Sequence, residues 1–391
     1  MSANAAAILA NPKPSWLDQE DVNMFDHAVR GFLEKECLPH GDRWEKEGAV
    51  DREIWTKAGE AGLLCPAAPE EFGGAGGDWR HDYVFHMAVA ELGVDGWGAS
   101  LHNSIVGPYV WHYGSKAQKE KLIPKLISGE YVGAIAMTEP GAGSDLQGVK
   151  TTAVKDGNGY RINGAKTFIT NGGTANFIIV VAKTDPKAGA KGTSLFLVET
   201  DGLEGFRRGR NLDKVGLKAQ DTAELFFEDM WVPADALLGD GEGMGFIQLM
   251  EQLPQERLQI AVQGVGMMKR ALAETIAYVK DRKAFGKSII EFQNTQFKLA
   301  ELKTKATIAE VFCQHCSDLL IQGKLDASTA SMAKYWVTDI QCELVDECVQ
   351  LHGGYGFMNE YPIARMWRDA RVQRIYGGTN EIMKLLISRT L

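Results

Sequence analysis

The chain has 391 residues, of which 45% are hydrophobic and 24% charged, and its net charge is -9. A chain of this length folds as more than one packed unit. No apolar run reaches the roughly 20 residues of a membrane span, and the acidic balance without a basic stripe argues against nucleic acid as the main partner. Residues 1–14 lack the basic-then-apolar order of a targeting peptide, so we expect a soluble cytoplasmic protein.

The first part of the chain, from about residue 16 to 127, has a helical pattern. Val22, Phe25, Val29 and Phe32 recur at spacings of three and four residues, as on the buried face of a helix. Further along, Ser115 and Gln118 have the spacing of a capping box that opens another helix.

The middle of the chain, between about residues 132 and 233, has a β pattern. Three short runs predict strands, at 177–182, 193–199 and 223–227. The residues of 156–159, Asp-Gly-Asn-Gly, predict a tight hairpin because they tolerate positive φ. We therefore expect a small sheet here.

The helical pattern returns after Gly245 and continues to Leu391, with breaks at residues 353–354 and 377–378. The order of helices, sheet and helices predicts an α+β fold. We expect an N-terminal helical domain over residues 1–131, a small barrel-like β domain over 132–240 and a C-terminal helical bundle over 241–391.

Six cysteines in a long chain of this kind are expected to be reduced thiols. Cys313 and Cys316 have a C-x-x-C spacing with His315 between them. Because the segment is predicted to be helical and no second ligand pair follows, we expect buried helix residues and no metal site.

A glycine-rich segment, residues 136–145, follows a predicted strand. Its glycines let backbone N–H groups approach a ligand closely, and Thr138 and Ser144 add hydroxyl groups. A plain connecting loop is the alternative. The segment has neither of the common phosphate-binding patterns, and its composition suits a flat polar ligand.

This segment resembles the first signature of the acyl-CoA dehydrogenase family. The stretch 350–369 is similar to the second signature, and 166–172, 282–287 and 292–293 are similar to further family segments in the same order. The resemblance covers nearly the whole chain and implies a family fold of helical, β and helical domains. It also implies FAD as cofactor, a homotetramer built as a dimer of dimers, and an electron-transfer flavoprotein as electron acceptor.

The resemblance also implies the residues of the flavin site. Phe168 stands where many members have tryptophan. The expected residues lie near the flavin ring or near the pyrophosphate and adenosine, and some of them come from a neighbouring subunit. They are Met137, Thr138, Gly143, Ser144, Phe168, Ile169, Thr170, Arg282, Phe285, Phe292, Gln293, Gln350, Leu351, Gly353, Gly354, Thr379 and Asn380.

The catalytic base is expected to be Glu256. Many members carry a glutamate just before the C-terminal Gly-Thr pair, but this chain has Gly377 there. The long-chain and isovaleryl members supply the base from an earlier helix, where this chain has residues 253–258, Leu-Pro-Gln-Glu-Arg-Leu. Burial beside a flavin and an acyl chain would raise the pKa of such a carboxylate toward the working range. Glu381 is a rival, and Glu139 is expected to be structural.

Substrate contacts are expected from Ser144, Arg257 and Gly378. The predicted reaction is α,β-dehydrogenation of an acyl-CoA thioester, most closely that of the long-chain type, with a medium- or long-chain fatty acyl group. The alternatives are a branched-chain or cyclic acyl-CoA dehydrogenase and a non-catalytic flavoprotein assembly factor. An acyl-CoA oxidase would need a longer chain.

Overall fold

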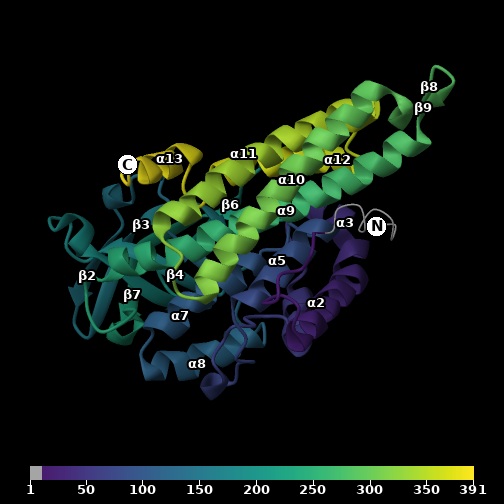
Figure 1. Cartoon of the computed structure of the whole chain (residues 1–391). Helices are drawn as coiled ribbons and strands as arrows, with labels where there is room; N and C mark the ends of the chain where they lie inside the picture. The colour runs from purple at the N-terminus through teal and green to yellow at the C-terminus, as the bar shows by residue number, and fades with distance from the viewer. Residues whose placement is uncertain (1–10) are drawn as a thin grey trace.

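A computed structural model describes residues 11–391. The expectation that residues 1–14 carry no targeting signal therefore falls mainly outside the described residues. Figure 1 shows helices at the start of the chain, a sheet on one side, and long helices that extend away from it. The predicted order of helices, sheet and helices is confirmed.

In the view of Figure 1, the N-terminal helices lie below the long C-terminal helices and below the sheet. Their bounds are α2 (Glu20–Phe32), α3 (Gly41–Glu47), α4 (Arg52–Glu60), α5 (Trp79–Leu92), α6 (Ala99–Leu101), α7 (Gly107–Tyr113) and α8 (Lys116–Ile127). The capping box expected at Ser115 is confirmed, because its side chain accepts from the backbone of Gln118 while the Gln118 side chain accepts from the backbone of Ser115.

The middle part is one mixed seven-stranded sheet. Its strands are β1 (Gly133–Ala136), β2 (Thr152–Asp156), β3 (Gly159–Thr170), β4 (Phe177–Lys183), β5 (Thr193–Glu199), β6 (Phe206–Asn211) and β7 (Thr222–Pro233). The order along the sheet is β1-β4-β2-β3-β7-β6, and β5 pairs with β4. The predicted hairpin joins β2 to β3, with Gly157 at a φ of 60°.

The sheet is covered on both faces, which explains the continuous apolar run of β4. Ile178 and Val180 pack into a core shared with the first helices, including Trp55 and Trp97. Phe177 and Ile179 pack on the other face with residues of α7 and α8, among them Tyr109. A strand buried on both faces shows no polar alternation.

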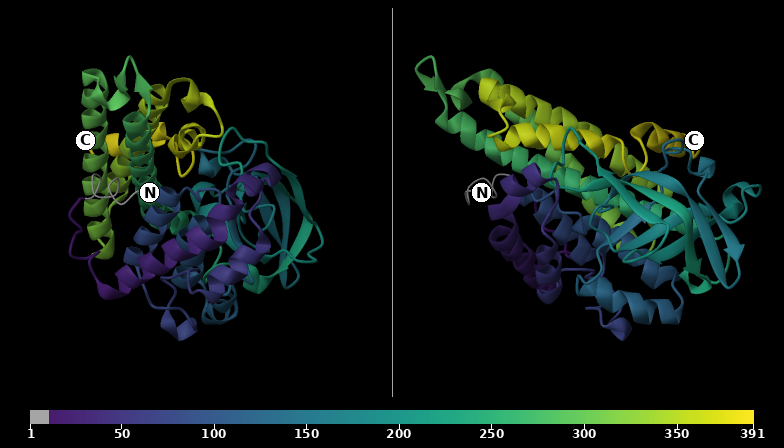
Figure 2. Two further views of the ribbon diagram at one scale, coloured as in Figure 1. Left: turned by 90° about the vertical axis from the view of Figure 1, so that its right-hand side faces the viewer. Right: turned by 180° about the vertical axis from the view of Figure 1, so that it is seen from behind.

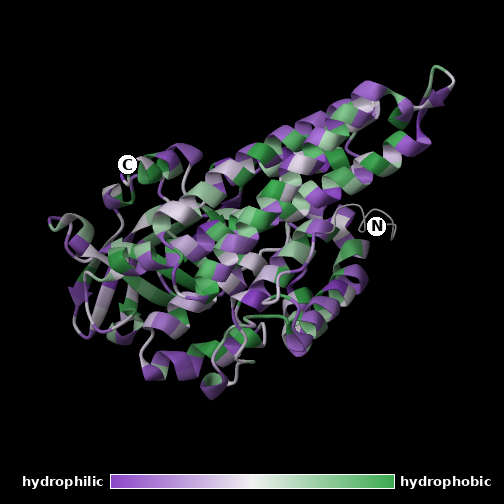
Figure 3. Ribbon diagram, in the orientation of Figure 1, coloured by the Kyte–Doolittle hydropathy of each residue, from purple (hydrophilic) through white to green (hydrophobic). Residues whose placement is uncertain are grey.

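The C-terminal part is built on three long helices. Its bounds are α9 (Gly245–Asp281), β8 (Lys283–Ala284), β9 (Lys287–Ser288), α10 (Gln293–Ile321), α11 (Ala327–His352), α12 (Pro362–Ala370) and α13 (Asn380–Ser388). The long helices run side by side, with the β8–β9 hairpin at their far tip and the sheet at the other end (Figures 1 and 2). Hydrophobic and hydrophilic residues alternate along them (Figure 3), as expected for helices with one buried face.

The expected domain boundaries fall close to changes in structure. β1 begins at Gly133, two residues after the expected first boundary, and α9 begins at Gly245, shortly after the second. The division at 131 and 240 stays a prediction. No helix of the described chain has the length and apolar character needed to cross a membrane.

Candidate active site

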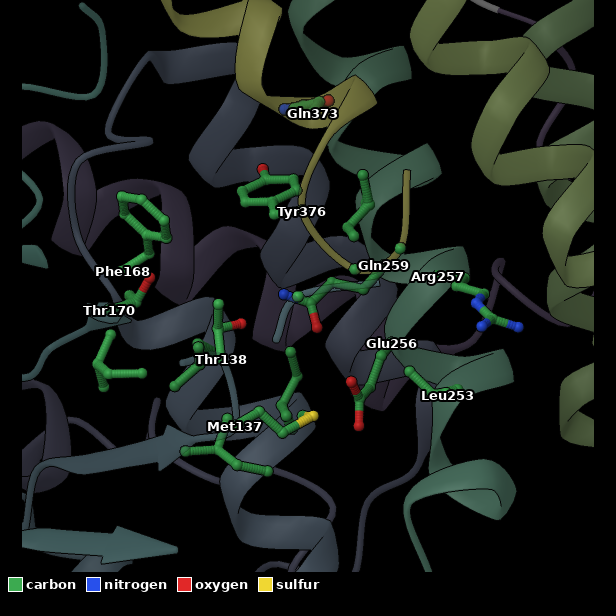
Figure 4. A pocket seen from close by; sticks show the side chains of 18 of the residues that line it. Met137, Thr138, Phe168, Thr170, Leu253, Glu256, Arg257, Gln259, Gln373 and Tyr376 are labelled. Carbon is green, nitrogen blue, oxygen red and sulfur yellow. The ribbon is translucent and has the colours of Figure 1, made fainter. Parts of the chain in front are cut away.

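A cavity of about 400 Å³ lies where the sheet, α9 and the segment before α13 meet. This volume is in the usual range for a small-molecule site. The cavity brings together many residues singled out in the sequence, from elements far apart in the chain (Figure 4). They are Met137, Thr138, Gly143, Ser144, Phe168, Ile169, Thr170, Glu256, Arg257 and Gly378.

Glu256 lines one side of this cavity. It lies on α9, two residues after Pro254, and is only 4% exposed. The Tyr109 hydroxyl donates a hydrogen bond of 3.0 Å to Glu256 Oε1. Burial raises the pKa of Glu256 to about 7, while the Tyr109 hydrogen bond and the nearby Arg257 charge oppose that shift. The side chain can therefore accept a proton near neutral pH.

Arg257 follows Glu256 but points away from it across the helix (Figure 4). It is buried, and its Nη1 lies 3.4 Å from Ser331 Oγ. Burial lowers the pKa of Arg257, although the Glu256 charge opposes this. Its Nε has no hydrogen-bond partner among residues 11–391, so this donor remains available for a ligand.

A buried ion pair fixes the glycine-rich loop. Lys166 Nζ lies 2.9 Å from Glu139 Oε1 and donates to the carbonyl of Met137 at 3.0 Å. Glu139 also accepts from the backbone N–H groups of Lys150 and Thr151. Glu139 is fully engaged in these contacts, which agrees with the structural role expected for it.

Phe168 has an unusual backbone conformation at the cavity wall. Its φ is 60°, in the left-handed region that aromatic residues rarely adopt, and it sits at a register shift in the pairing of β3 with β7. The residue is 67% exposed, and its ring lies on the opposite side of the cavity from Glu256 (Figure 4). A strained position that presents an aromatic ring to a cavity is typical of a ligand site.

Gly377, where the family resemblance leads us to expect a C-terminal base in many members, lies in the same cavity. Gly377 has a φ of 64°, and a Cβ there would lie 2.4 Å from Ile260 Cδ1. Gly378 also has a positive φ, and Lys334 Nζ donates to its carbonyl at 2.7 Å. Glu381, in the first turn of α13, is exposed and lies outside the cavity. Glu256 is the glutamate that lines this site.

The remaining residues of the expected flavin site lie elsewhere. Eight of them surround the far tip of the long helices, and most are exposed there: Arg282, Phe285, Phe292, Gln293, Gln350, Leu351, Gly353 and Gly354. At this tip the Arg282 guanidinium lies 5.5 Å from the centre of the Tyr355 ring. Thr379 caps α13, and the buried Asn380 bonds to Lys334 and Thr338. One chain therefore carries the expected flavin residues in separate groups.

Several cavity residues were not expected from the sequence. Gln259 and Gln263 line the cavity, and their spacing from Glu256 on α9 could have indicated it. Tyr109, which bonds to Glu256, has no local sequence signal that links the two residues. Other unexpected members are Trp97, Ser100, Gln373 and Tyr376.

The C-x-x-C segment lies within α10. Cys313 and Cys316 are buried, while His315 is exposed. Across residues 11–391, no group of three or more His, Cys, Asp or Glu side chains is arranged to hold a metal ion.

Comparisons with known proteins match nearly all of the described chain. Family models for the N-terminal, middle and C-terminal domains of acyl-CoA dehydrogenases match residues 19–130, 134–230 and 243–391. A long-chain specific acyl-CoA dehydrogenase of Mus musculus, named as mitochondrial, is 52% identical over 94% of this chain and 86% of its own length.

Two solved structures are also similar. An acyl-CoA dehydrogenase from Geobacillus kaustophilus has a TM-score of 0.93 and 49% identity, covering 95% of this chain and 98% of that one. A glutaryl-CoA dehydrogenase from Mycobacterium smegmatis in complex with FADH2 has a TM-score of 0.88 and 27% identity, covering 97% and 96%.

Proposed function

Because this chain belongs to the acyl-CoA dehydrogenase family of flavin oxidoreductases, we propose that it binds FAD and converts a medium- or long-chain fatty acyl-CoA to the trans-2-enoyl-CoA. The observation that carries the proposal is Glu256, a buried carboxylate with a pKa raised to about 7 inside the cavity.

In the proposed reaction the Glu256 carboxylate takes a proton from the α carbon. Bound FAD would supply the acceptor for the hydride of the β carbon, so that the α and β C–H bonds are replaced by the double bond. Tyr109 holds the carboxylate in place and favours its ionised form. Arg257 and the backbone at Gly378 supply donors at the edge of the cavity, and Ser144 lines its wall.

The cavity suits the ring end of FAD. The Thr138 and Thr170 hydroxyls line it, and the exposed Phe168 ring offers an apolar face to a flat ring system. Gly143 and Ser144 line the same wall, in the loop that the Glu139–Lys166 pair holds. The mycobacterial relative solved with FADH2 gives further support, because its fold matches over nearly all of this chain.

The adenosine end of FAD is proposed to bind to a neighbouring subunit. Arg282 and Gln293 lie at the exposed far tip, away from the cavity of their own chain. Along α10, Phe297, Ile308 and Val311 expose apolar side chains at spacings of eleven and three residues, which places them on one face. An exposed apolar face beside a half-site supports the expected homotetramer.

Replacing Arg282 with alanine tests the shared site. The apparent molecular mass by gel filtration and the flavin content of the purified protein should both fall below those of the wild type. The matched control is Arg161→Ala, because Arg161 is an exposed cation of β3 outside the cavity and the tip. An Arg282→Ala protein that is a monomer with full flavin would contradict the shared site.

The electron acceptor and location follow from the same family expectation. We expect an electron-transfer flavoprotein to take the electrons, and the cytoplasmic location stays a prediction. A branched or cyclic substrate is the alternative within the family. The buried Glu256 argues against a non-catalytic assembly factor.

The decisive experiment is Glu256→Gln. Glutamine keeps the size of the side chain but takes no proton, and general base catalysis contributes roughly 10²–10⁴-fold. Flavin bleaching after rapid mixing with saturating acyl-CoA should slow by that factor, while FAD and acyl-CoA still bind. Glu251→Gln is the matched control, because Glu251 is an exposed carboxylate on the same helix that bonds to Tyr113. Near-normal bleaching in Glu256→Gln would mean that another group is the base.

A further inference from the structure

One face of α9 lines the cavity with an unusual mixture of side chains. Glu256, Gln259, Ile260 and Gln263 all line it, at spacings of three, four and seven residues that place them on one face of the helix. The inward face of a helix is ordinarily apolar. Here two of the three positions beyond the base are amides.

Gln259 presents an unpaired amide oxygen. The side chain is 4% exposed, and its Oε1 has no hydrogen-bond partner among the described residues. Figure 4 shows its amide projecting into the cavity between Tyr376 and Thr138. Buried amide oxygens are nearly always satisfied, so this one indicates a partner that the ligand supplies.

Gln263 is held by a buried hydrogen-bonded chain. Its Nε2 donates to Ser100 Oγ at 2.9 Å, and Ser100 Oγ lies 3.2 Å from His86 Nδ1. His86 Nε2 lies 2.9 Å from Ser104 Oγ, which donates to Asp82 Oδ1 at 2.7 Å. Every member of this chain is buried.

The hydrogen bonds of this series all run in one direction, from Gln263 toward Asp82. Burial lowers the pKa of His86 to about 3, so its ring is neutral and only one nitrogen donates. Because Ser104 donates to Asp82, His86 donates to Ser104 and accepts from Ser100. Ser100 in turn accepts from Gln263, which fixes the Gln263 amide with its carbonyl end turned away from Ser100.

The charges of the cavity select the kind of group that these amides can bind. Arg257 is the only Lys or Arg that lines it in residues 11–391, and Asp95 and Asp145 add carboxylates. A substrate with a second carboxylate would place that negative charge beside the amide oxygen of Gln259, with no cation on that side of the cavity to balance it. A hydroxyl group, which donates a hydrogen bond, satisfies an amide oxygen.

We propose that the preferred substrate is an acyl-CoA whose chain carries a hydroxyl group beyond the reacting carbons, bound by Gln259 and Gln263. This inference rests on the proposed function, because Glu256 marks the position of the α carbon. Along α9, Gln259 lies about 4.5 Å and Gln263 about 10.5 Å beyond Glu256. The hydroxyl therefore belongs to the part of the chain that does not react.

The test compares terminally hydroxylated and plain acyl-CoAs of matched length, from hexanoyl to dodecanoyl. At the length that places the hydroxyl at the amides, kcat/KM should favour the hydroxylated substrate about tenfold or more. Calorimetric dissociation constants of the hydroxylated and plain enoyl-CoA products measure the same preference without turnover. Gln259→Leu should shift the preference toward the plain chain, and Gln263→Leu should do so at greater length.

Gln322→Leu is the matched control, because Gln322 is exposed at the end of α10 and should keep the wild-type preference. Equal or better use of the plain chain at every length by the wild-type enzyme would overturn the inference. So would a preference that neither leucine variant changes. Absence of flavin reduction by all the thioesters would instead refute the proposed function, so the two failures are distinguishable.

Discussion

Tyr109→Phe should move the pH dependence of catalysis to higher pH. The hydroxyl donates to Glu256 at 3.0 Å in a buried site, and phenylalanine removes it with little change of shape. A hydrogen bond to a charged group contributes about 1.5–3 kcal/mol, and one pKa unit corresponds to 1.36 kcal/mol. Since the hydrogen bond favours the carboxylate, its loss should raise the pKa of Glu256 from about 7 by about one unit or more.

The base acts only when ionised, so kcat/KM at pH 7 should fall about fivefold for a shift of one unit and converge with the wild type near pH 9. Tyr113→Phe is the control, because Tyr113 lies on the same helix but bonds to Glu251. Flavin absorbance and thermal unfolding establish that both variants are folded. An acidic limb that stays in place, or moves to lower pH, would refute this account of Glu256.

Three further predictions follow from the site. The pKa of Glu256 is about 7 against an ordinary 4.5, so its ionisation destabilises the fold as pH rises through this window, by up to roughly 3 kcal/mol. Glu256→Gln should therefore lose less thermal stability than the wild type between pH 5 and pH 8, and equal losses would contradict this. Adding Gly377→Glu to Glu256→Gln should restore little turnover, because a Cβ there lies 2.4 Å from Ile260 Cδ1. Adding Ile260→Ala should improve that rescue. Lys166→Met leaves Glu139 buried without its partner and should cost roughly 3–5 kcal/mol in urea unfolding; restored stability in the double variant with Glu139→Gln would confirm the cause.

The parts of the fold that the sequence predicted depend on local signals. The capping box at Ser115, the hairpin at Gly157 and the breaks at Gly353 and Gly377 follow from residues next to each other in the chain. The alternation between helical and β patterns likewise needs only short windows. The limits of elements such as β7, which extends beyond the predicted run at both ends, depend on pairing with distant strands.

The sequence could not predict which distant side chains meet in the site. Tyr109 and Glu256 are 147 residues apart, and no pattern links them. The resemblance named Arg282 and Phe168 as parts of one flavin site, but in a single chain they lie at different places. By contrast, the positions of Gln259 and Gln263 relative to Glu256 follow helical spacing and were available from the sequence.

Helix α9 joins the proposed base to the far tip without interruption. Arg282 caps the C-terminal end of α9, 26 positions after Glu256, which is about 39 Å at the rise of an α-helix. Each residue added between them would turn one end against the other by about 100°. An insertion between them would misalign Glu256 and Arg282 without changing either residue. The length of α9 therefore fixes both the distance between its two ends and their rotation relative to each other. A single insertion or deletion changes both at once.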